Sequence, residues 1–468
     1  MREQQERRLL DAVLPPLTGQ SRAWYAWLGV LLVLLSVGTF AYVVQLRRGL
    51  AVTGMSDHVP WGLYISNFVF WSGVSMAGTF VSAMLRITGA EWRRPLTRIA
   101  ELSTVSALII AATMPLLDLG RPDRAWSLPI RGRVESPLVW DLLVIPTYLA
   151  ASALFLYLFL IPDAAVLRDR LQGRAPRIRL AAYRVLALGW RDHPAQRRLL
   201  HRGAWIMTIL IIPIGVATHS VVSWIFGMTT RPGWDSTIFA PYFVVGALYS
   251  GTAMLITLMF IFRRVYRLEE YFTEQHFRYL GYFLAASGIL YLYFTFAEYL
   301  TLVYKLPGEE RHLLESLFFG KYAALVWAGF VGGQVIPIVL AVLPWTRAIR
   351  VLFVASLLVN VGMWIKRYII VLPSLTVPLV GSEWGVYSPT WVEVAIVVAS
   401  FAGFALIFTV FAKLFPILPI WEVQEGWQAA ASGETGLTAD SFAPHIGREP
   451  RVAVGVSNVV TAEGAGND

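Results

Sequence analysis

Ten apolar runs dominate this sequence, and each is about as long as a bilayer crossing requires. A helix needs about 20 mostly apolar residues to span the hydrocarbon core, so each run predicts one membrane-spanning helix. Charged residues make up 15% of the 468 residues, against about a quarter in soluble chains. The sequence therefore predicts an all-α integral membrane protein of about ten transmembrane helices. The runs cover residues 24–46, 61–84, 101–118, 138–161, 204–226, 239–262, 278–304, 319–343, 348–371 and 391–415.

The runs divide the chain into a leading segment 1–23, a membrane domain 24–420 and an end segment 421–468. Gly, Ala, Ser and acidic residues are frequent in the end segment, which predicts a poorly ordered tail. The loop 163–202 carries ten arginines and three aspartates, and basic loops favour the cytoplasmic side. With ten spans, both termini then lie in the cytoplasm. We expect a multi-pass protein of a bacterial inner membrane.

Composition excludes several kinds of redox protein. The chain has no cysteine, so it has no thiolate for an iron–sulfur cluster and no attachment point for a c-type haem. Of the seven histidines only His219 lies clearly inside a predicted span, which argues against a bis-histidine haem. We expect no haem, iron–sulfur cluster or metal site in this chain. The net charge of +9 follows from basic loops, and we expect no nucleic acid partner.

Five ionisable side chains fall toward the non-cytoplasmic ends of the predicted helices. An ionisable group inside a bilayer costs several kcal/mol unless it is paired or faces a cavity, so such residues are functional candidates. Oxidation of a quinol releases two protons with two electrons, and histidine or carboxylate side chains accept protons near pH 7. We therefore predict His219, Asp141 and Asp235 as catalytic residues, with Asp118 and Glu298 nearby.

A quinone also needs an apolar, aromatic slot open to lipid. The side chains predicted to line such a slot are Asp118, Arg121, Trp224, Trp234 and Tyr242, and Glu101 and Glu298 are predicted to carry protons. The four charged side chains have structural alternatives. Asp118 and Arg121 could pair with neighbouring charges in a wet loop, Tyr299 could hold Glu298, and Glu101 could have an interfacial structural role.

Several stretches, taken in order, resemble the NrfD/PsrC family of quinone-interacting membrane subunits, and within it the ten-helix ActC and ActF subunits of alternative complex III. They are VPWGLYISNFVFWSGVSMAGTF, EWRRPLTRIAELST, SPLVWDLLVIPTYLAASALFLYLFLIPD, HSVVSWIF, PGWDSTIFAPYFVVGALYSG and NVGMWIKRYIIVLPSL. The resemblance implies two four-helix bundles with flanking helices and a quinone pocket near the face where an iron–sulfur partner docks. It points to Asp141, His219, Asp235 and the stretch from Asn67 to Trp71. The family pattern has His, Asp and His where Met76, Ile225 and Asp235 stand, which leaves the type of partner open.

We expect a membrane subunit that oxidises quinol or reduces quinone, either menaquinone or ubiquinone. It would exchange electrons with an iron–sulfur partner of ferredoxin-like or molybdopterin type, within a complex that includes other membrane subunits. Proton translocation is a further expectation, and we expect no complete redox activity from the chain alone. Two alternatives stay open. One is a secondary transporter or ion pump, favoured by ten helices with intramembrane charge, and the other is a structural anchor without quinone.

Overall fold

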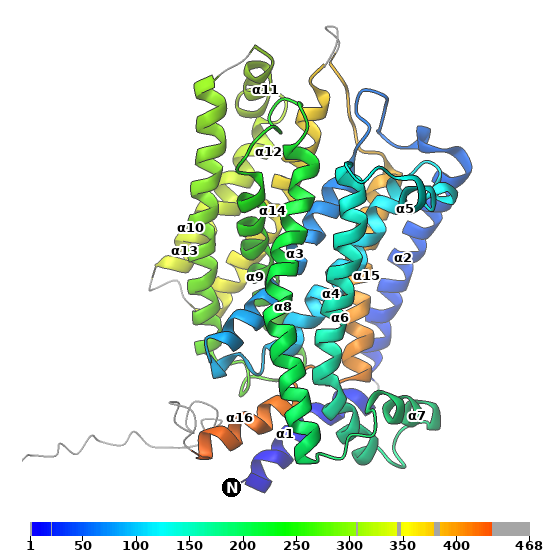
Figure 1. The fold of residues 1–468 in the computed structure, drawn as a ribbon, viewed down its shortest axis with the longest axis vertical. Helices are drawn as coiled ribbons and strands as arrows, with labels where there is room; N and C mark the ends of the chain where they lie inside the picture. Colours follow the sequence, from blue (N-terminus) through cyan, green and yellow to red (C-terminus); the bar gives the residue numbers. More distant parts are fainter. Residues whose placement is uncertain (1, 20, 306–307, 344–347, 379–383, 433–468) are drawn as a thin grey trace, which may run out of the picture.

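A computed structural model of the chain describes residues 2–19, 21–305, 308–343, 348–378 and 384–432. All regular structure within these residues is helical (Figure 1). In these ranges ten helical segments are long and apolar enough to cross a membrane, which confirms the predicted fold class. They are α2 (Arg22–Arg48), α3 (Leu63–Ile87), α4 (Thr97–Asp118), α6 (Pro137–Arg170), α8 (Pro194–Gly227), α9 (Phe239–Val265), α10 (Glu274–Lys305), the continuous segment Ala323–Val342, α14 (Ile349–Thr376) and α15 (Trp391–Leu414).

The membrane helices form two four-helix bundles with a flanking pair, as the family resemblance implied. In the first bundle α3, α4, α6 and α8 contact one another in a ring. In the second, α9, α10, the segment Ala323–Val342 and α14 do the same. Helix α3 also packs against α9 and α14, which joins the bundles, and α2 pairs with α15 on one flank. Side chains of α3 and α9 are therefore buried in the centre of the molecule.

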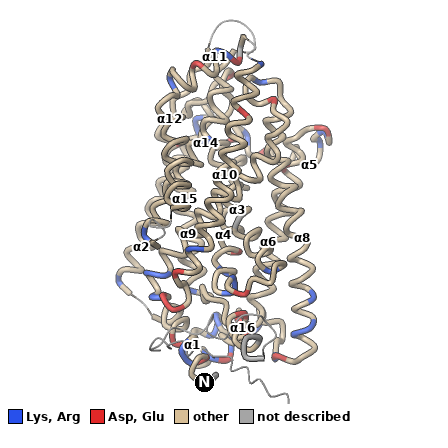
Figure 2. Tube along the Cα trace, turned by 90° about the vertical axis from the view of Figure 1, so that its left-hand side faces the viewer, with Lys and Arg blue, Asp and Glu red and all other residues tan. Residues whose placement is uncertain are grey.

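Short helices cover both ends of the bundles (Figure 1). We call the end with α1 (Arg2–Thr18), α7 (Arg177–Leu186) and α16 (Ile420–Ser432) the lower end, and the end with α5 (Ser127–Arg131) and α11 (Gly308–Phe318) the upper end. Basic side chains gather at the lower end, and the middle of the molecule is nearly free of charge (Figure 2). The end segment 421–468 begins with most of α16, and its residues 433–468 lie outside the described chain.

Two glycines allow an unusually close contact inside the second bundle. The segment Ala323–Val342 consists of α12 (Ala323–Trp327), a π-helical part η4 (Ala328–Val335) and α13 (Ile336–Val342). Gly333 of η4 lies against Gly362 of α14, and the Gly333 carbonyl accepts a hydrogen bond of 3.2 Å from Tyr249. Small residues let membrane helices approach closely, and π-helical turns often accompany functional sites.

We expect Gly362→Ala to push α14 away from η4. A Cβ atom at this position would lie 2.2 Å from the Gly333 Cα, so the backbones must move, at a cost of about 1–3 kcal/mol. Thermal unfolding of the purified protein in detergent measures this loss. Gly332→Ala is the matched control, because no atom lies within 4 Å of its added Cβ. Equal melting temperatures for the two variants would contradict the expectation.

Candidate functional site

Asp141 of α6 and His219 of α8 lie on two helices that pack against each other in the upper half of the first bundle. Two contacts between α6 and α8 bracket Asp141: the Trp140 ring centroid lies 6.4 Å from that of Trp224, and Thr218 donates to the Val144 carbonyl at 3.4 Å. Asp141 therefore lies on α6 between two points of contact with α8, and the second of these involves Thr218, the residue before His219. Its side chain is 9% exposed, and its Oδ1 atom has no hydrogen-bond partner among the described residues.

The His219 ring links α8 to α3. Its Nδ1 lies 2.8 Å from the Gly215 carbonyl oxygen and its Nε2 lies 2.8 Å from the Ser72 carbonyl oxygen. Both neighbours are acceptors, whereas a neutral imidazole has a single N–H to donate. A protonated ring would satisfy both carbonyls. The imidazolium form would therefore have an acceptor for each of its two N–H groups.

The predicted residues Asn67 and Trp71 belong to a buried hydrogen-bond network between α3 and α15. The Asn67 amide and the Trp71 indole donate to the Ser400 hydroxyl at 2.8 and 3.2 Å, and the Trp364 indole donates to Asn67 Oδ1 at 3.3 Å. Asn67 and Trp71 are fully buried. These hydrogen bonds connect α3 to the flanking helix α15 and to α14.

The charged residues predicted near the upper end do not converge on Asp141. Arg121 is exposed and makes two hydrogen bonds of 3.0 Å to Asp123, the structural alternative expected for that loop. Asp235 is exposed in the loop between α8 and α9, on the side of α11. Burial and the nearby Asp235 carboxylate raise the pKa of Glu310 in α11. Asp118, at the end of α4, is partly buried, and its Oδ1 has no described partner.

The two predicted tryptophans have different surroundings. Trp224 is 37% exposed and contacts Trp140. Trp234 is buried, stacks on Trp61 and donates its indole N–H to the Ile370 carbonyl at 2.6 Å. Trp234 therefore connects the loop before α9 to α14.

Glu298 of α10 is paired with a lysine that sequence reasoning missed. Lys366 of α14 lies with its Nζ 3.3 Å from Glu298 Oε2 and donates to the Tyr299 hydroxyl at 3.1 Å. Both side chains of the ion pair are about 93–94% buried. A lysine in the middle of an apolar run is itself a signal by the rule for intramembrane charge. The averaged hydropathy of the run concealed it.

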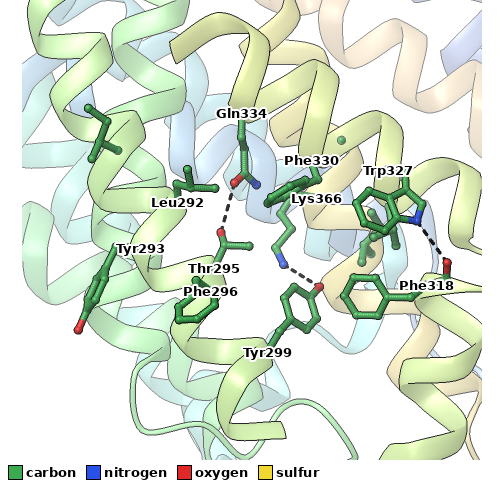
Figure 3. A pocket seen from close by; sticks show the side chains of 14 residues that line it. Leu292, Tyr293, Thr295, Phe296, Tyr299, Phe318, Trp327, Phe330, Gln334 and Lys366 are labelled. Carbon is green, nitrogen blue, oxygen red and sulfur yellow. Dashed lines mark hydrogen bonds between the residues drawn. The ribbon is translucent and has the colours of Figure 1, made fainter. Parts of the chain in front are cut away.

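The ion pair borders a cavity of about 620 Å³ between α10, η4 and α14 (Figure 3). Lys366, Tyr299, Thr295 and Gln334 supply its polar groups. The predicted residue Tyr242 lies beside it: its hydroxyl is 2.9 Å from Thr295 Oγ1, and its ring centroid is 5.5 Å from Lys366 Nζ. Tyr242 thus belongs to the second bundle and not to the first, where Asp141 and His219 lie.

Glu101, predicted for a proton path, lies in the lower half of α4. It is 1% exposed, and neither carboxylate oxygen has a hydrogen-bond partner among the described residues. One turn earlier, Arg98 donates to Asp163 of α6 at 2.9 Å, with both side chains fully buried. A buried carboxyl group without a hydrogen-bond partner is typical of a proton carrier in a membrane protein. The role of Glu101 in a proton path stays a prediction.

A second buried charge cluster ties α16 to the lower end. Glu422 accepts from Arg86 at 2.5 Å, from Arg93 at 3.1 Å and from the Thr97 hydroxyl at 2.5 Å. Burial raises the pKa of Glu422, but Arg86 and Arg93 outweigh it and lower the pKa to about 2. Sequence reasoning placed Glu422 in the tail and missed this contact.

These features define the class of protein: a polytopic membrane protein with two helical bundles and buried ionisable groups in the upper half of each. The family model for polysulphide reductase NrfD matches residues 51–378. The chain belongs to the NrfD family. This confirms the family named by its sequence motifs.

Curated relatives in this family belong to reductases. The chain is 28% identical over 420 residues to a putative membrane subunit of dimethyl sulfoxide reductase from Halobacterium salinarum, covering 84% of this chain and 91% of the relative. It is 24% identical to the integral membrane subunit of a menaquinone reductase from Nitratidesulfovibrio vulgaris, with the same coverage. It is 23% identical to a subunit of selenate reductase from Mesobacillus selenatarsenatis, covering 73% and 80%. All three of these relatives are named as subunits of reductases.

Proposed function

We propose that the chain oxidises quinol at Asp141 and His219 and passes the electrons to an iron–sulfur partner at the upper end. The observation that carries the proposal is the buried Asp141 Oδ1, which has no partner among the described residues and belongs to the helix that packs against α8, where His219 lies. A buried carboxylate oxygen costs free energy unless it is hydrogen-bonded, and a quinol hydroxyl is a donor of the right kind. The reverse direction, quinone reduction, uses the same groups.

The proposed reaction removes two hydrogen atoms from the quinol. Both O–H bonds break, two electrons leave to the partner's iron–sulfur centre, and the ring becomes a quinone. Asp141 accepts one proton directly. His219 accepts the second proton on the ring nitrogen that carries no hydrogen in the neutral form, and the imidazolium then donates to both backbone carbonyls. Asp235, exposed at the upper end, releases protons to the aqueous side. Asp118 and Arg121 border this exit, and Glu101 and Glu298 carry protons elsewhere in the bundles.

The proposal includes an orientation and partners. The arginine-rich lower end lies in the cytoplasm of a bacterial inner membrane, with both termini there, and the upper end faces the opposite side. The partner binds the upper end and is ferredoxin-like or part of a molybdopterin-type enzyme. One relative is named as a menaquinone reductase subunit, which favours menaquinone over ubiquinone. The finer resemblance to the subunits of alternative complex III is part of the proposal.

We expect Asp141→Asn and His219→Ala each to slow quinol oxidation by the assembled complex at least about 100-fold, because each removes a proton acceptor. The measurement is turnover with a quinol analogue, together with gel analysis of assembly. Asp123→Asn, in the exposed pair with Arg121, is the control and should retain activity. Unchanged turnover in both site variants would refute the proposal. A purified complex without any quinone would favour the transporter alternative.

A further inference from the structure

The cavity of the second bundle contains unsatisfied hydrogen-bond donors from two different helices. An ammonium group has three N–H donors, and Lys366 directs two of them to Glu298 and Tyr299. The third has no acceptor among the described residues. Gln334 is 3% exposed and accepts a hydrogen bond of 3.4 Å from Thr295 through its amide oxygen. Its amide nitrogen has no described acceptor. Figure 3 shows both side chains projecting into the same space.

The rest of the lining is apolar and aromatic. Tyr293, Phe296, Trp327 and Phe330 surround the cavity. Tyr293, Phe296 and Trp327 are 61%, 63% and 47% exposed, so this side opens to the surface that the bilayer covers. A volume of about 620 Å³ is in the range of pockets that hold a small cyclic ligand. The π-helical turn η4 places Phe330 and Gln334 on the cavity side.

We propose that this cavity is a second binding site for an isoprenoid quinone, separate from the site at Asp141 and His219. A quinone ring carries two carbonyl acceptors on opposite edges, and Lys366 and Gln334 offer one donor each. The aromatic walls stack on the ring, and the isoprenoid tail leaves between Tyr293, Phe296 and Trp327 into the lipid. The proposal rests on the proposed function for the identity of the ligand class, but it uses residues of the other bundle.

The N–H donors of Lys366 and Gln334 that have no acceptor in the described chain distinguish a quinone from the acyl chain of a phospholipid, which is the other apolar ligand that fits this cavity. An acyl chain would fill the aromatic part of the cavity and leave both donors unsatisfied, and an unsatisfied buried donor costs free energy. A quinone satisfies both donors. Glu298 accepts one of the three ammonium N–H groups of Lys366 at 3.3 Å and Tyr299 accepts a second at 3.1 Å, which leaves the third for a ring carbonyl.

Photolabelling of the complete complex in native membranes with an azido-quinone tests the proposal. Peptide mapping should find label in α10 or η4 as well as in α6 or α8. Leu292→Trp fills the cavity and should reduce labelling of α10 and η4 at least fivefold, and Gln334→Leu should reduce it by removing a donor. Leu290→Trp is the matched control, because Leu290 is on the same helix, 45% exposed and outside the cavity lining. It should leave the labelling unchanged.

This experiment measures the labelling of each bundle separately. Label in α6 or α8 but not in α10 or η4 would overturn the second site and leave the proposed function standing. Label in α10 and η4 that Leu292→Trp does not reduce, or a phospholipid found there by native mass spectrometry, would also overturn it. Label confined to α10 and η4 would support the second site and count against the proposed site at Asp141 and His219. Retained labelling of α6 or α8 shows that the variants are folded.

Discussion

Lys366→Met is expected to destabilise the second bundle severely. The change leaves Glu298 buried without its partner, because both side chains of the ion pair are about 93–94% buried. Removing one member of a buried ion pair costs about 3–5 kcal/mol, since the remaining charge stays desolvated. We expect a large fall in melting temperature and in the yield of assembled complex. Thermal unfolding in detergent and quantification of the complex on native gels measure both.

The double variant Glu298→Gln with Lys366→Met separates charge from packing. It removes both charges and keeps similar side-chain volumes, so we expect most of the lost stability to return. It also removes the ammonium donor from the cavity, so stability should recover while azido-quinone labelling of α10 and η4 stays low. A double variant as unstable as Lys366→Met would show that packing, and not the unpaired charge, dominates.

Glu422→Gln is expected to release α16 from the lower end. Arg86, Arg93 and Thr97 all bond this carboxylate, and its side chain is 2% exposed. A glutamine cannot neutralise the two arginines, so we expect a loss of about 3–5 kcal/mol from the contact. Hydrogen exchange of α16, followed by mass spectrometry, measures the release. Glu315→Gln, in an exposed pair with Arg311, is the control and should leave exchange of α16 unchanged.

The contact of Glu422 with Arg86 and Arg93 also predicts that the protection of α16 from hydrogen exchange depends on pH. The pKa of Glu422 is lowered from its ordinary value of 4.5 to about 2 in the folded protein. A lowered folded-state pKa contributes stability that is complete above the ordinary value and is lost as the pH falls toward the folded value. Protection of α16 should therefore decline between about pH 4.5 and about pH 2 in the wild type. A flat profile over this window would show that Glu422 does not hold the helix.

The helices could be predicted from sequence because the bilayer imposes one length and one composition on every crossing. Apolar runs located all ten spans, and the rule for intramembrane charge selected Asp141, His219 and Glu298, which are buried. Local patterns say nothing about which helices meet. The partner of Glu298 is 68 residues away on α14, and hydropathy averaging concealed Lys366 among its apolar neighbours.

The cavity was beyond sequence reasoning for a different reason. It depends on a π-helical turn and on the contact between Gly333 and Gly362, and small residues in membrane helices are too common to single out such a contact. The search for long apolar runs did not find α16, because this helix lies outside the membrane spans and is not apolar enough. Its Trp421 and Glu422 pack into the protein all the same, and that pairing depends on arginines more than 300 residues earlier.

Helix α16 follows all the described membrane helices in the sequence and contacts two of the earliest of them at the lower end. The backbone N–H groups of Ile420 and Trp421 donate to Asp163, at 3.2 and 2.9 Å, and Glu422 neutralises arginines contributed by α3 and the turn that follows it. Every membrane helix is synthesised before these residues. The contacts that α16 makes with Asp163, Arg86 and Arg93 can therefore form only after the membrane helices named above have been synthesised.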